Sequence, residues 1–302
     1  MKPAHLPIPA SRQTLPASLA GSMLVVGMIA ISFSALFVKW TEADVAVAAM
    51  YRLLFTNVLM LPFFIRYWPE VKRIALHDWM LLAASGLFLG IHFLLWMGSL
   101  NHTTVASSTV LLTLEPIFVM IGAFLLYRER IRLQGIIGIG IAMLGTVLIG
   151  WGDFSLSGEA LQGDTMSLLS ALAVAVHMLL GQRLRSRISS YVYSFTVFLA
   201  AAGVLAAYNV GAGNAFTGYA ARDWQLFLLL AIVPTLFGHL LFNWLLRYMR
   251  ASTISMSVLG EPVGASLLAA LFLNERLGYQ QLAASALLLI GVWLFLRQAS
   301  SK

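Results

Sequence analysis

Ten apolar stretches, each about 20 residues long, occupy most of this chain of 302 residues. They lie at approximately residues 18–40, 44–67, 79–98, 103–127, 134–152, 164–184, 190–211, 223–246, 251–273 and 279–297. A stretch of this length crosses the hydrocarbon core of a bilayer as a helix. Because lipid cannot hydrogen-bond the backbone, each span must satisfy its own polar groups. The chain is therefore predicted to be an all-α polytopic membrane protein with ten transmembrane helices.

Composition excludes a soluble protein. Hydrophobic residues make up 60% of the sequence and charged residues only 10%, whereas soluble domains carry about 25% charged residues. The chain has no cysteine, which excludes disulfides, thiolate metal sites and cysteine nucleophiles.

The basic residues indicate the orientation. If the N-terminus is cytoplasmic, 15 of the 19 Lys and Arg residues fall in inner segments. The positive-inside rule then places both termini in the cytoplasm, and the expected location is the plasma (inner) membrane. The net charge of +7 reflects this topology and an attraction to anionic lipid, so nucleic acid is not an expected partner.

The sequence repeats itself at an offset of 146 residues. Glu115 and Pro116 align with Glu261 and Pro262, and Gly145 aligns with Gly291. Each copy holds five spans, so the second copy must be inverted relative to the first. The predicted organisation is a cytoplasmic tail (1–17), a first five-helix repeat (18–152), an extracytoplasmic linker (153–163), a second repeat (164–298) and a short C-terminal tail (299–302).

Inverted repeats favour an alternating-access transporter, in which two copies exchange conformations around a midplane site. The alternative is a duplication kept only for stability.

Three formally charged residues lie well inside spans: Arg52, Glu115 and Glu261. A charge at the bilayer centre costs about 2.5–3.5 kcal/mol on insertion scales, so such residues face a cavity or a partner. Pro116 and Pro262 follow the two acids, and since proline has no N–H, each helix should kink there. We interpret the two Glu-Pro pairs as gating hinges or proton-coupling groups. The alternative is that both acids are uncharged and hydrogen-bond across the repeat interface.

Arg52 lies about two turns from the outer end of its helix and cannot lose its proton. Its guanidinium suits a carboxylate, so one interpretation is a clamp for an anionic group of a substrate. The alternatives are a salt bridge to Glu115, or extension toward Asp44 or Glu42.

His92, His177 and His239 also lie inside spans. Trp96 follows His92 by one turn, and Asn243 follows His239 by one turn, so each pair shares a helix face. We expect these five residues, with Arg52, to bind substrate at the midplane between spans 1, 3, 6 and 8. The alternative for each histidine is a hydrogen bond between helices. The histidine spacing does not predict a metal site.

The Glu-Pro pair, an acid fourteen residues later, a glutamine five residues beyond it and a glycine in the next helix form a recognisable set. In the second copy these are Glu261, Glu275, Gln280 and Gly291. The chain resembles the EamA repeat of the drug/metabolite transporter superfamily over nearly its whole length. One departure is Ala284, where the first copy has Gly138. Within the superfamily the chain is similar to YddG-type amino-acid exporters, which implies outward movement of aromatic and other neutral amino acids.

The expected function is secondary export of small neutral metabolites, including amino acids, without cofactor, ATP or metal, by a protein that acts as a monomer. Export of another metabolite or drug by proton antiport is the alternative. A membrane-embedded enzyme or a channel is a further alternative. However, the sequence lacks the P-loop of an ATP-driven pump and the ring of charge of a channel. It also lacks a nucleophile–base motif, so the chain is not expected to be an enzyme.

Overall fold

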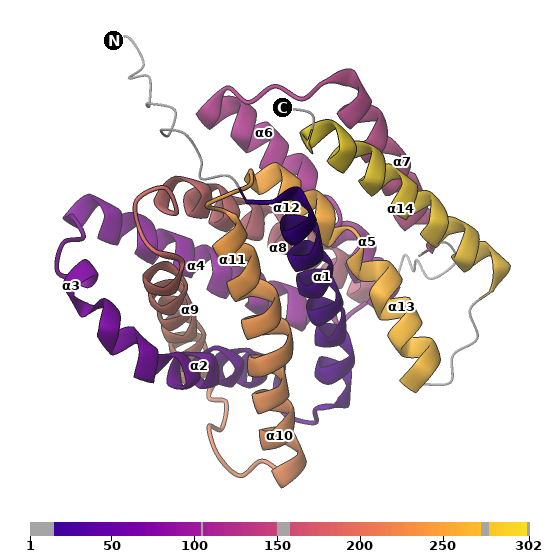
Figure 1. The fold of residues 1–302 in the computed structure, drawn as a ribbon. Coiled ribbons are helices and arrows are strands. Elements are labelled where there is room, and N and C mark those ends of the chain that lie inside the picture. The colour runs from indigo at the N-terminus through magenta and orange to yellow at the C-terminus, as the bar shows by residue number, and fades with distance from the viewer. Residues whose placement is uncertain (1–14, 104, 150–157, 273–277, 301–302) are drawn as a thin grey trace.

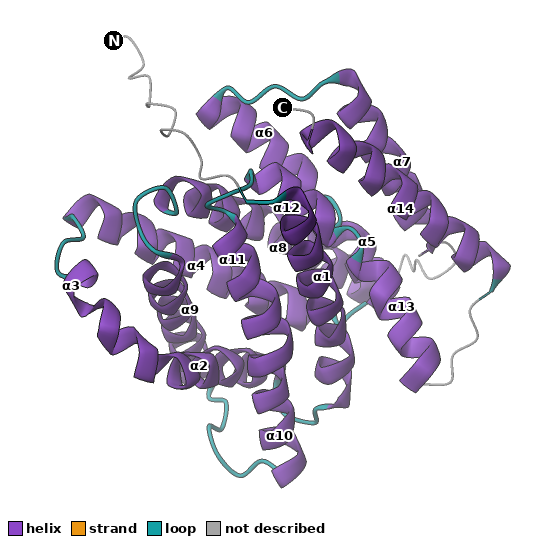
Figure 2. Cartoon of the chain, in the orientation of Figure 1, coloured by secondary structure: helices purple, strands orange, loops and turns teal. Residues whose placement is uncertain are grey.

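The computed structural model describes residues 15–103, 105–149, 158–272 and 278–300, and all regular structure within these ranges is helical (Figures 1 and 2). The helices of the first half are α1 (Ala17–Trp40), α2 (Val45–Phe64), the 3-10 helix η1 (Ile65–Tyr67), α3 (Trp68–Val71), α4 (Leu76–Ser99), α5 (Val105–Leu112), α6 (Glu115–Tyr127) and α7 (Leu133–Ile149). Those of the second half are α8 (Gly158–Leu184), α9 (Ser190–Ala212), α10 (Ala221–Leu230), the π-helix η2 (Ala231–Leu240), α11 (Leu241–Leu245), α12 (Ala251–Val258), α13 (Glu261–Phe272) and α14 (Tyr279–Ser300).

The predicted spans are confirmed. Among the described residues, nine helical segments are long and apolar enough to cross a bilayer, and the tenth, Leu133–Ile149, is apolar but shorter, at 17 residues. These ten segments coincide with the ten stretches predicted from the sequence.

Helices α8 and α14 extend beyond the spans predicted from the sequence. Helix α8 begins at Gly158, so the second half of the predicted linker 153–163 is helical, while residues 153–157 lie outside the described residues. Helix α14 continues to Ser300, into the predicted tail 299–302. Apolar length predicts only the part of a helix that lies in hydrocarbon, and a helix can continue beyond it into the interface. Most of the predicted N-terminal tail also lies outside the described residues, as do Glu275 and Arg276.

The fourth and ninth spans are each broken at the Glu-Pro pair, where kinks were predicted. Helix α5 ends at Leu112 and α6 begins at Glu115, while α12 ends at Val258 and α13 begins at Glu261. Proline occupies the second position of each new helix, where its missing N–H has no partner to lose. The prediction of kinks is confirmed, and each kink separates two helices.

The eighth span contains a ten-residue π-helix, Ala231–Leu240, that the sequence analysis did not predict. Pro234 lies inside it, and the Thr235 hydroxyl donates to the Leu230 carbonyl at 2.8 Å. A proline removes an i→i−4 hydrogen bond, and wider turns of this kind are often found at functional sites. The repeat-equivalent helix α4 is regular over its whole length.

Helix packing follows the inverted repeat. Helix α4 packs against α8 and α9, and its repeat equivalent, the span α10–η2–α11, packs against α1 and α2. Helix α6 packs against α8 as α13 packs against α1. Because each of these contacts recurs in the other half, the two halves are related by a pseudo-twofold axis, as expected for two inverted five-helix repeats.

Glycines hold α7 and α14 in close contact at one side of the bundle (Figure 1). A Cβ on Gly138 would lie 2.8 Å from the Gly291 carbonyl oxygen, and one on Gly145 would lie 2.8 Å from the Ala284 carbonyl oxygen. Small residues of this kind allow backbones to approach closely in lipid. Since Gly145 and Gly291 are repeat equivalents, as are Gly138 and Ala284, the two contacts are related by the pseudo-twofold axis.

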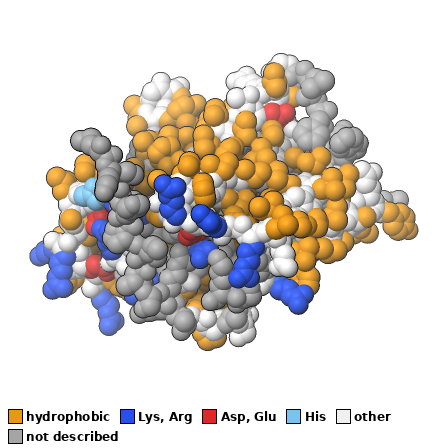
Figure 3. Space-filling view, turned by 90° about the horizontal axis from the view of Figure 1, so that it is seen from above, with side chains coloured by type: hydrophobic (Ala, Val, Ile, Leu, Met, Phe, Trp, Pro, Cys, Tyr) orange, Lys and Arg blue, Asp and Glu red, His pale blue; other side chains and the backbone are white. Residues whose placement is uncertain are grey.

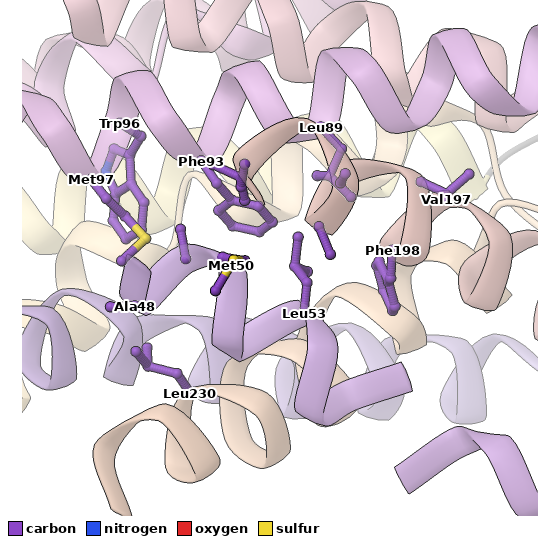
Figure 4. Close-up of a cluster of buried hydrophobic side chains, with 14 of the residues drawn as sticks. Ala48, Met50, Leu53, Leu89, Phe93, Trp96, Met97, Val197, Phe198 and Leu230 are labelled. Atoms are coloured by element: carbon purple, nitrogen blue, oxygen red, sulfur yellow. The ribbon is translucent and has the colours of Figure 1, made fainter. Parts of the chain in front are cut away.

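The largest apolar core lies among α2, α4, α9 and α10, where Met50, Leu53, Phe93 and Phe198 are buried (Figure 4). The same core extends to Trp96, which places the aromatic residues of α4 between this packed region and the polar interior described below.

Helix α1 begins and α14 ends at the same end of the bundle, and Figure 3, seen from that end, shows Lys and Arg side chains among hydrophobic ones. The positive-inside rule assigns this end to the cytoplasm. The orientation stays a prediction.

Candidate functional site

A cavity between the two repeats, here called the central cavity, contains about 630 Å³ of empty space. Side chains from both repeats line it. The lining residues are Ile31, Ser34, His92, Phe93, Trp96, Leu112, Glu115, Val174, His177, Met178, His239, Phe242, Asn243, Leu246, Val258 and Glu261. They come from spans 1, 3, 6 and 8, as predicted, and also from the broken spans 4 and 9.

Two carboxylates lie at the breaks of spans 4 and 9. Glu115 begins α6 and is 4% exposed, and Glu261 begins α13 and is 8% exposed. A position at the start of a helix favours negative charge, because unpaired N–H groups and the helix dipole point toward it. In each Glu-Pro pair, therefore, a buried glutamate lies at the positive, N-terminal end of a half-helix.

Aromatic rings form one wall of the cavity. His92 stacks on Trp96 with centroids 6.3 Å apart and ring planes 3° from parallel. Phe93 contacts His239 with centroids 5.2 Å apart in an edge-to-face arrangement. We call these four residues the ring wall. Such a wall suits an apolar or aromatic group, since ring faces and edges offer both apolar area and quadrupole contacts.

Two serine–histidine pairs join α4 to α8. His92 Nδ1 lies 2.8 Å from Ser170 Oγ and 3.3 Å from the Ser170 carbonyl oxygen. His177 Nδ1 lies 2.9 Å from Ser85 Oγ and 3.2 Å from the Ser85 carbonyl oxygen. A carbonyl oxygen only accepts, so these contacts favour a proton on Nδ1 of each ring and leave Nε2 as an acceptor.

The two serines were not predicted from the sequence, although the spacing between serine and histidine on each helix could have indicated them. Ser85 and His92 are seven residues apart on α4, and Ser170 and His177 are seven residues apart on α8. An antiparallel crossing of two such helices matches each serine with a histidine. The proposed alternative for the histidines, a hydrogen bond between helices, therefore holds for His92 and His177 in addition to their place in the cavity lining.

Arg52 is fully buried next to the central cavity but does not line it. Its Nε donates to Thr235 Oγ1 at 2.8 Å and its Nη1 donates to Ser34 Oγ at 3.0 Å. The guanidinium lies over the Phe93 ring, 4.3 Å from the centroid, and Nη2 has no hydrogen-bond partner among the described residues.

The suggested salt bridge between Arg52 and Glu115 is wrong. Arg52 takes part in none of the three ion pairs found among the described residues. Its charge interacts instead with that of Glu261. The π-helix explains part of this difference, because it carries Thr235, which binds the guanidinium.

A second pocket, here called the axial pocket, lies between the breaks of spans 4 and 9 and contains about 230 Å³ of empty space. Its ten lining residues form five pairs, each separated by 146 positions: Thr109 and Ser255, Leu112 and Val258, Thr113 and Leu259, Glu115 and Glu261, Pro116 and Pro262. The axial pocket therefore lies on the pseudo-twofold axis. It shares Leu112, Glu115, Val258 and Glu261 with the central cavity.

Polar contacts join different helices at both ends of the bundle. At the end that holds the termini, Gln182 on α8 donates to Glu129 at 3.0 Å and accepts from the Ala251 backbone N–H at 2.6 Å. At the other end, Asp223 accepts from the Thr41 hydroxyl at 2.6 Å and from the Glu42 N–H at 3.0 Å.

The structure brings together most of the predicted site residues. Seven of the ten line the central cavity: His92, Trp96, His177, His239, Asn243, Glu115 and Glu261. Pro116 and Pro262 line the axial pocket, and Arg52 lies behind Phe93. Ser34, Phe93 and Thr235 were missed, because serine, phenylalanine and threonine are common in spans and no spacing rule marks them.

Comparisons with known proteins agree with this architecture. A model of the EamA-like transporter family matches residues 19–151 and 161–297. An "Uncharacterized transporter" from Archaeoglobus fulgidus is 24% identical over 91% of this chain and 95% of its own length. The protein "Uncharacterized transporter YxxF" from Bacillus subtilis is 27% identical over 72% of this chain and 70% of its own length. A shorter protein from Hamiltonella defensa, "Probable 4-amino-4-deoxy-L-arabinose-phosphoundecaprenol flippase subunit ArnE", is 31% identical over 28% of this chain and 75% of its own length.

A crystal structure of another protein shares the fold, with a TM-score of 0.79, 18% sequence identity, and coverage of 95% of this chain and 99% of that one.

Proposed function

The chain belongs to the EamA-like transporter family, and from this premise we propose that it is a secondary exporter of small neutral metabolites, amino acids including aromatic ones among them. It acts by alternating access about the central cavity. The observation that carries the proposal is a cavity between inverted repeats, lined from both repeats by carboxylates, imidazoles and aromatic rings. The proposed setting is the plasma membrane, with both termini cytoplasmic and the protein acting as a monomer.

The cavity chemistry supports a zwitterionic substrate with an apolar side chain. The ring wall offers apolar and quadrupole contacts to the side chain. The carboxylates of Glu115 and Glu261, and imidazole nitrogens that accept hydrogen bonds, suit an ammonium group. Arg52, with its unpartnered Nη2 behind Phe93, is the candidate for the carboxylate.

The two breaks support a gating role for Glu115, Pro116, Glu261 and Pro262. Each break separates a half-helix that packs near one end of the bundle from a half-helix that packs near the other. Opening toward one side has to disrupt either the Gln182 contacts or the Asp223 contacts. In this proposal the half-helices pivot at the breaks while the cavity stays in the middle of the membrane.

A second candidate is antiport of another small metabolite or drug against protons. The two buried carboxylates in the cavity favour it, because acids inside transporters often relay protons. Reversing an imposed pH gradient across proteoliposomes then reverses the direction of net transport. Transport that ignores the gradient speaks against this candidate.

The main experiment is flux of labelled amino acids in sealed proteoliposomes that contain the purified protein. We expect saturable uptake that unlabelled aromatic and neutral amino acids compete. Non-saturating conductance indicates a channel, and chemical conversion of the substrate indicates an enzyme. Either result contradicts the proposal.

Replacing Trp96 or His92 with alanine is expected to weaken substrate binding by about tenfold or more, because loss of one stacked ring costs on the order of 1 kcal/mol beyond its buried area. Competition assays measure the change. Trp293→Ala is the matched control, since Trp293 is 55% exposed and does not line the cavity. Wild-type transport by folded Trp96→Ala and His92→Ala proteins means that the substrate binds elsewhere.

A further inference from the structure

One hydroxyl group in the wall of the central cavity has a proton to donate and no acceptor for it. Ser34 on α1 is 3% exposed, lines the cavity, and accepts a hydrogen bond from Arg52 Nη1 at 3.0 Å. Thr235, the other hydroxyl that Arg52 binds, donates its own proton to the Leu230 carbonyl at 2.8 Å. The Ser34 hydroxyl donates to no group among the described residues. A buried donor without an acceptor is costly, so Ser34 is suited to a ligand in the cavity that accepts a hydrogen bond.

A positive charge lies directly behind this hydroxyl. Arg52 is fully buried, keeps its proton and forms no ion pair with an acid among the described residues. The Phe93 ring covers the guanidinium at 4.3 Å, so Arg52 itself does not line the cavity. Hydrogen bonds in series polarise one another, and a low local dielectric strengthens them. A serine that accepts from a guanidinium is therefore a better donor, and it favours an anionic oxygen over a neutral one.

A hydrogen-bond acceptor lies close to this donor. Glu261 lines the same cavity, and its backbone carbonyl lies 3.4 Å from the hydroxyl oxygen of Ser32, two residues before Ser34. Its side chain interacts electrostatically with Arg52. In an α-amino acid the carboxylate and the ammonium group are bonded to the same carbon atom, so their binding groups have to adjoin. An amine has no group for Ser34 to bind, and a simple carboxylic acid has no ammonium group for Glu261.

We propose that Ser34 binds the α-carboxylate of the substrate, and that the substrates are α-amino acids with apolar side chains, in preference to amines or carboxylic acids. Arg52 is a positioning residue in this proposal: it holds Ser34 Oγ, supplies the positive charge, and acts on the carboxylate through the hydroxyl. The inference rests on the proposed function, because it names the head group of the substrate proposed there.

The experiment is equilibrium binding of three radiolabelled compounds to the purified full-length protein: L-phenylalanine, phenethylamine, which lacks the carboxylate, and phenylpropionate, which lacks the ammonium group. We expect the wild type to bind phenylalanine about tenfold more tightly than either analogue, or tighter still, because a hydrogen bond to a charged group is lost with each. The ratio of two affinities measured on one preparation does not depend on how much of the protein is folded.

Ser34→Ala is expected to weaken phenylalanine binding by about tenfold and to leave phenethylamine binding unchanged, so that the ratio of the two affinities approaches one. Ser34→Thr keeps the hydroxyl and is expected to keep most of the preference for phenylalanine. Arg52→Met is expected to lower the ratio as well, since the hydroxyl loses the charge behind it. A purely structural role for either residue changes the amount of active protein and leaves the ratio as it is.

Ser257→Ala is the matched control. Ser257 is 4% exposed, donates to the Thr253 carbonyl at 3.0 Å and lines neither the central cavity nor the axial pocket. We expect it to keep the wild-type ratio. Equal weakening of phenylalanine and phenethylamine binding in Ser34→Ala, or the same fall of the ratio in Ser257→Ala, overturns the proposal.

The outcomes also separate this inference from the proposed function. Saturable transport by a wild type that binds phenylalanine and phenethylamine equally overturns the role of Ser34 and leaves export of small neutral metabolites intact. Phenylalanine binding that depends on Ser34, without any flux in proteoliposomes, contradicts the proposed function and leaves the binding role of Ser34 intact. A wild type that binds none of the three compounds contradicts both.

Discussion

Replacing Arg52 with methionine is expected to abolish transport and to lower the free energy of unfolding by about 3–5 kcal/mol, the usual cost of removing one partner from a buried charged network. The guanidinium is fully buried and donates to Thr235 and Ser34. Its removal leaves both hydroxyls without their donor and leaves Glu261 without its compensating charge. Thermal unfolding and proteoliposome flux measure the two effects.

The double variant Arg52→Met, Glu261→Gln tests the cause. If Arg52 stabilises the fold by offsetting Glu261, removal of both charges is expected to restore part of the stability that Arg52→Met alone loses, which a double-mutant cycle measures as an interaction energy. Arg222→Met is the control, since Arg222 lies on the exposed surface. A double variant no more stable than Arg52→Met shows that the two charges do not compensate each other.

Gly291→Ala is expected to have the second large effect, a loss of stability. The added methyl group forces apart α7 and α14, which are the fifth spans of the two repeats. An added Cβ collides with the Ala142 backbone nitrogen and lies 2.5 Å from the Gly138 carbonyl oxygen. Overpacking of this kind costs about 1–3 kcal/mol, and here the obstacles are backbone atoms, which cannot rotate away. We expect a lower Tm in detergent and a smaller yield of folded protein.

Gly140→Ala is the control for this substitution. Gly140 lies on α7, yet a Cβ there meets nothing within 4 Å. We expect it to match the wild type or to be slightly more stable, because alanine has the higher helix propensity. If the two variants unfold at the same temperature, close packing of α7 and α14 does not limit stability.

These predictions depend on two kinds of information. The spans, their number and kinks at Pro116 and Pro262 were predicted from the sequence, because hydrophobic length and the missing N–H of proline act locally. The inverted repeat was also predicted, since identical residues recur 146 positions apart and each copy has an odd number of spans. The membrane orientation rests on charge distribution alone and stays a prediction.

The candidate site was predicted as a set of residues, without the contacts among them. Seven of the ten predicted residues line the central cavity. A charged or imidazole group inside a span is costly enough to be noticed in a sequence. Serine, threonine and phenylalanine carry no such cost inside a span, so Ser85, Ser170 and Thr235 were not predicted as site residues.

Only the tertiary structure decided which partner each buried group has. From the sequence, a salt bridge to Glu115 and a contact with a substrate were equally good predictions for Arg52. In the structure its guanidinium donates hydrogen bonds to Thr235 and Ser34. That choice depends on the π-helix and on the rotation of each helix about its axis. A change of one residue in register turns a helical side chain by about 100°. The sequence by itself determined the helices, the repeat and the position of each acid along its span. The packing of helices from both repeats decided that the two acids, 146 positions apart in the chain, line the same two pockets.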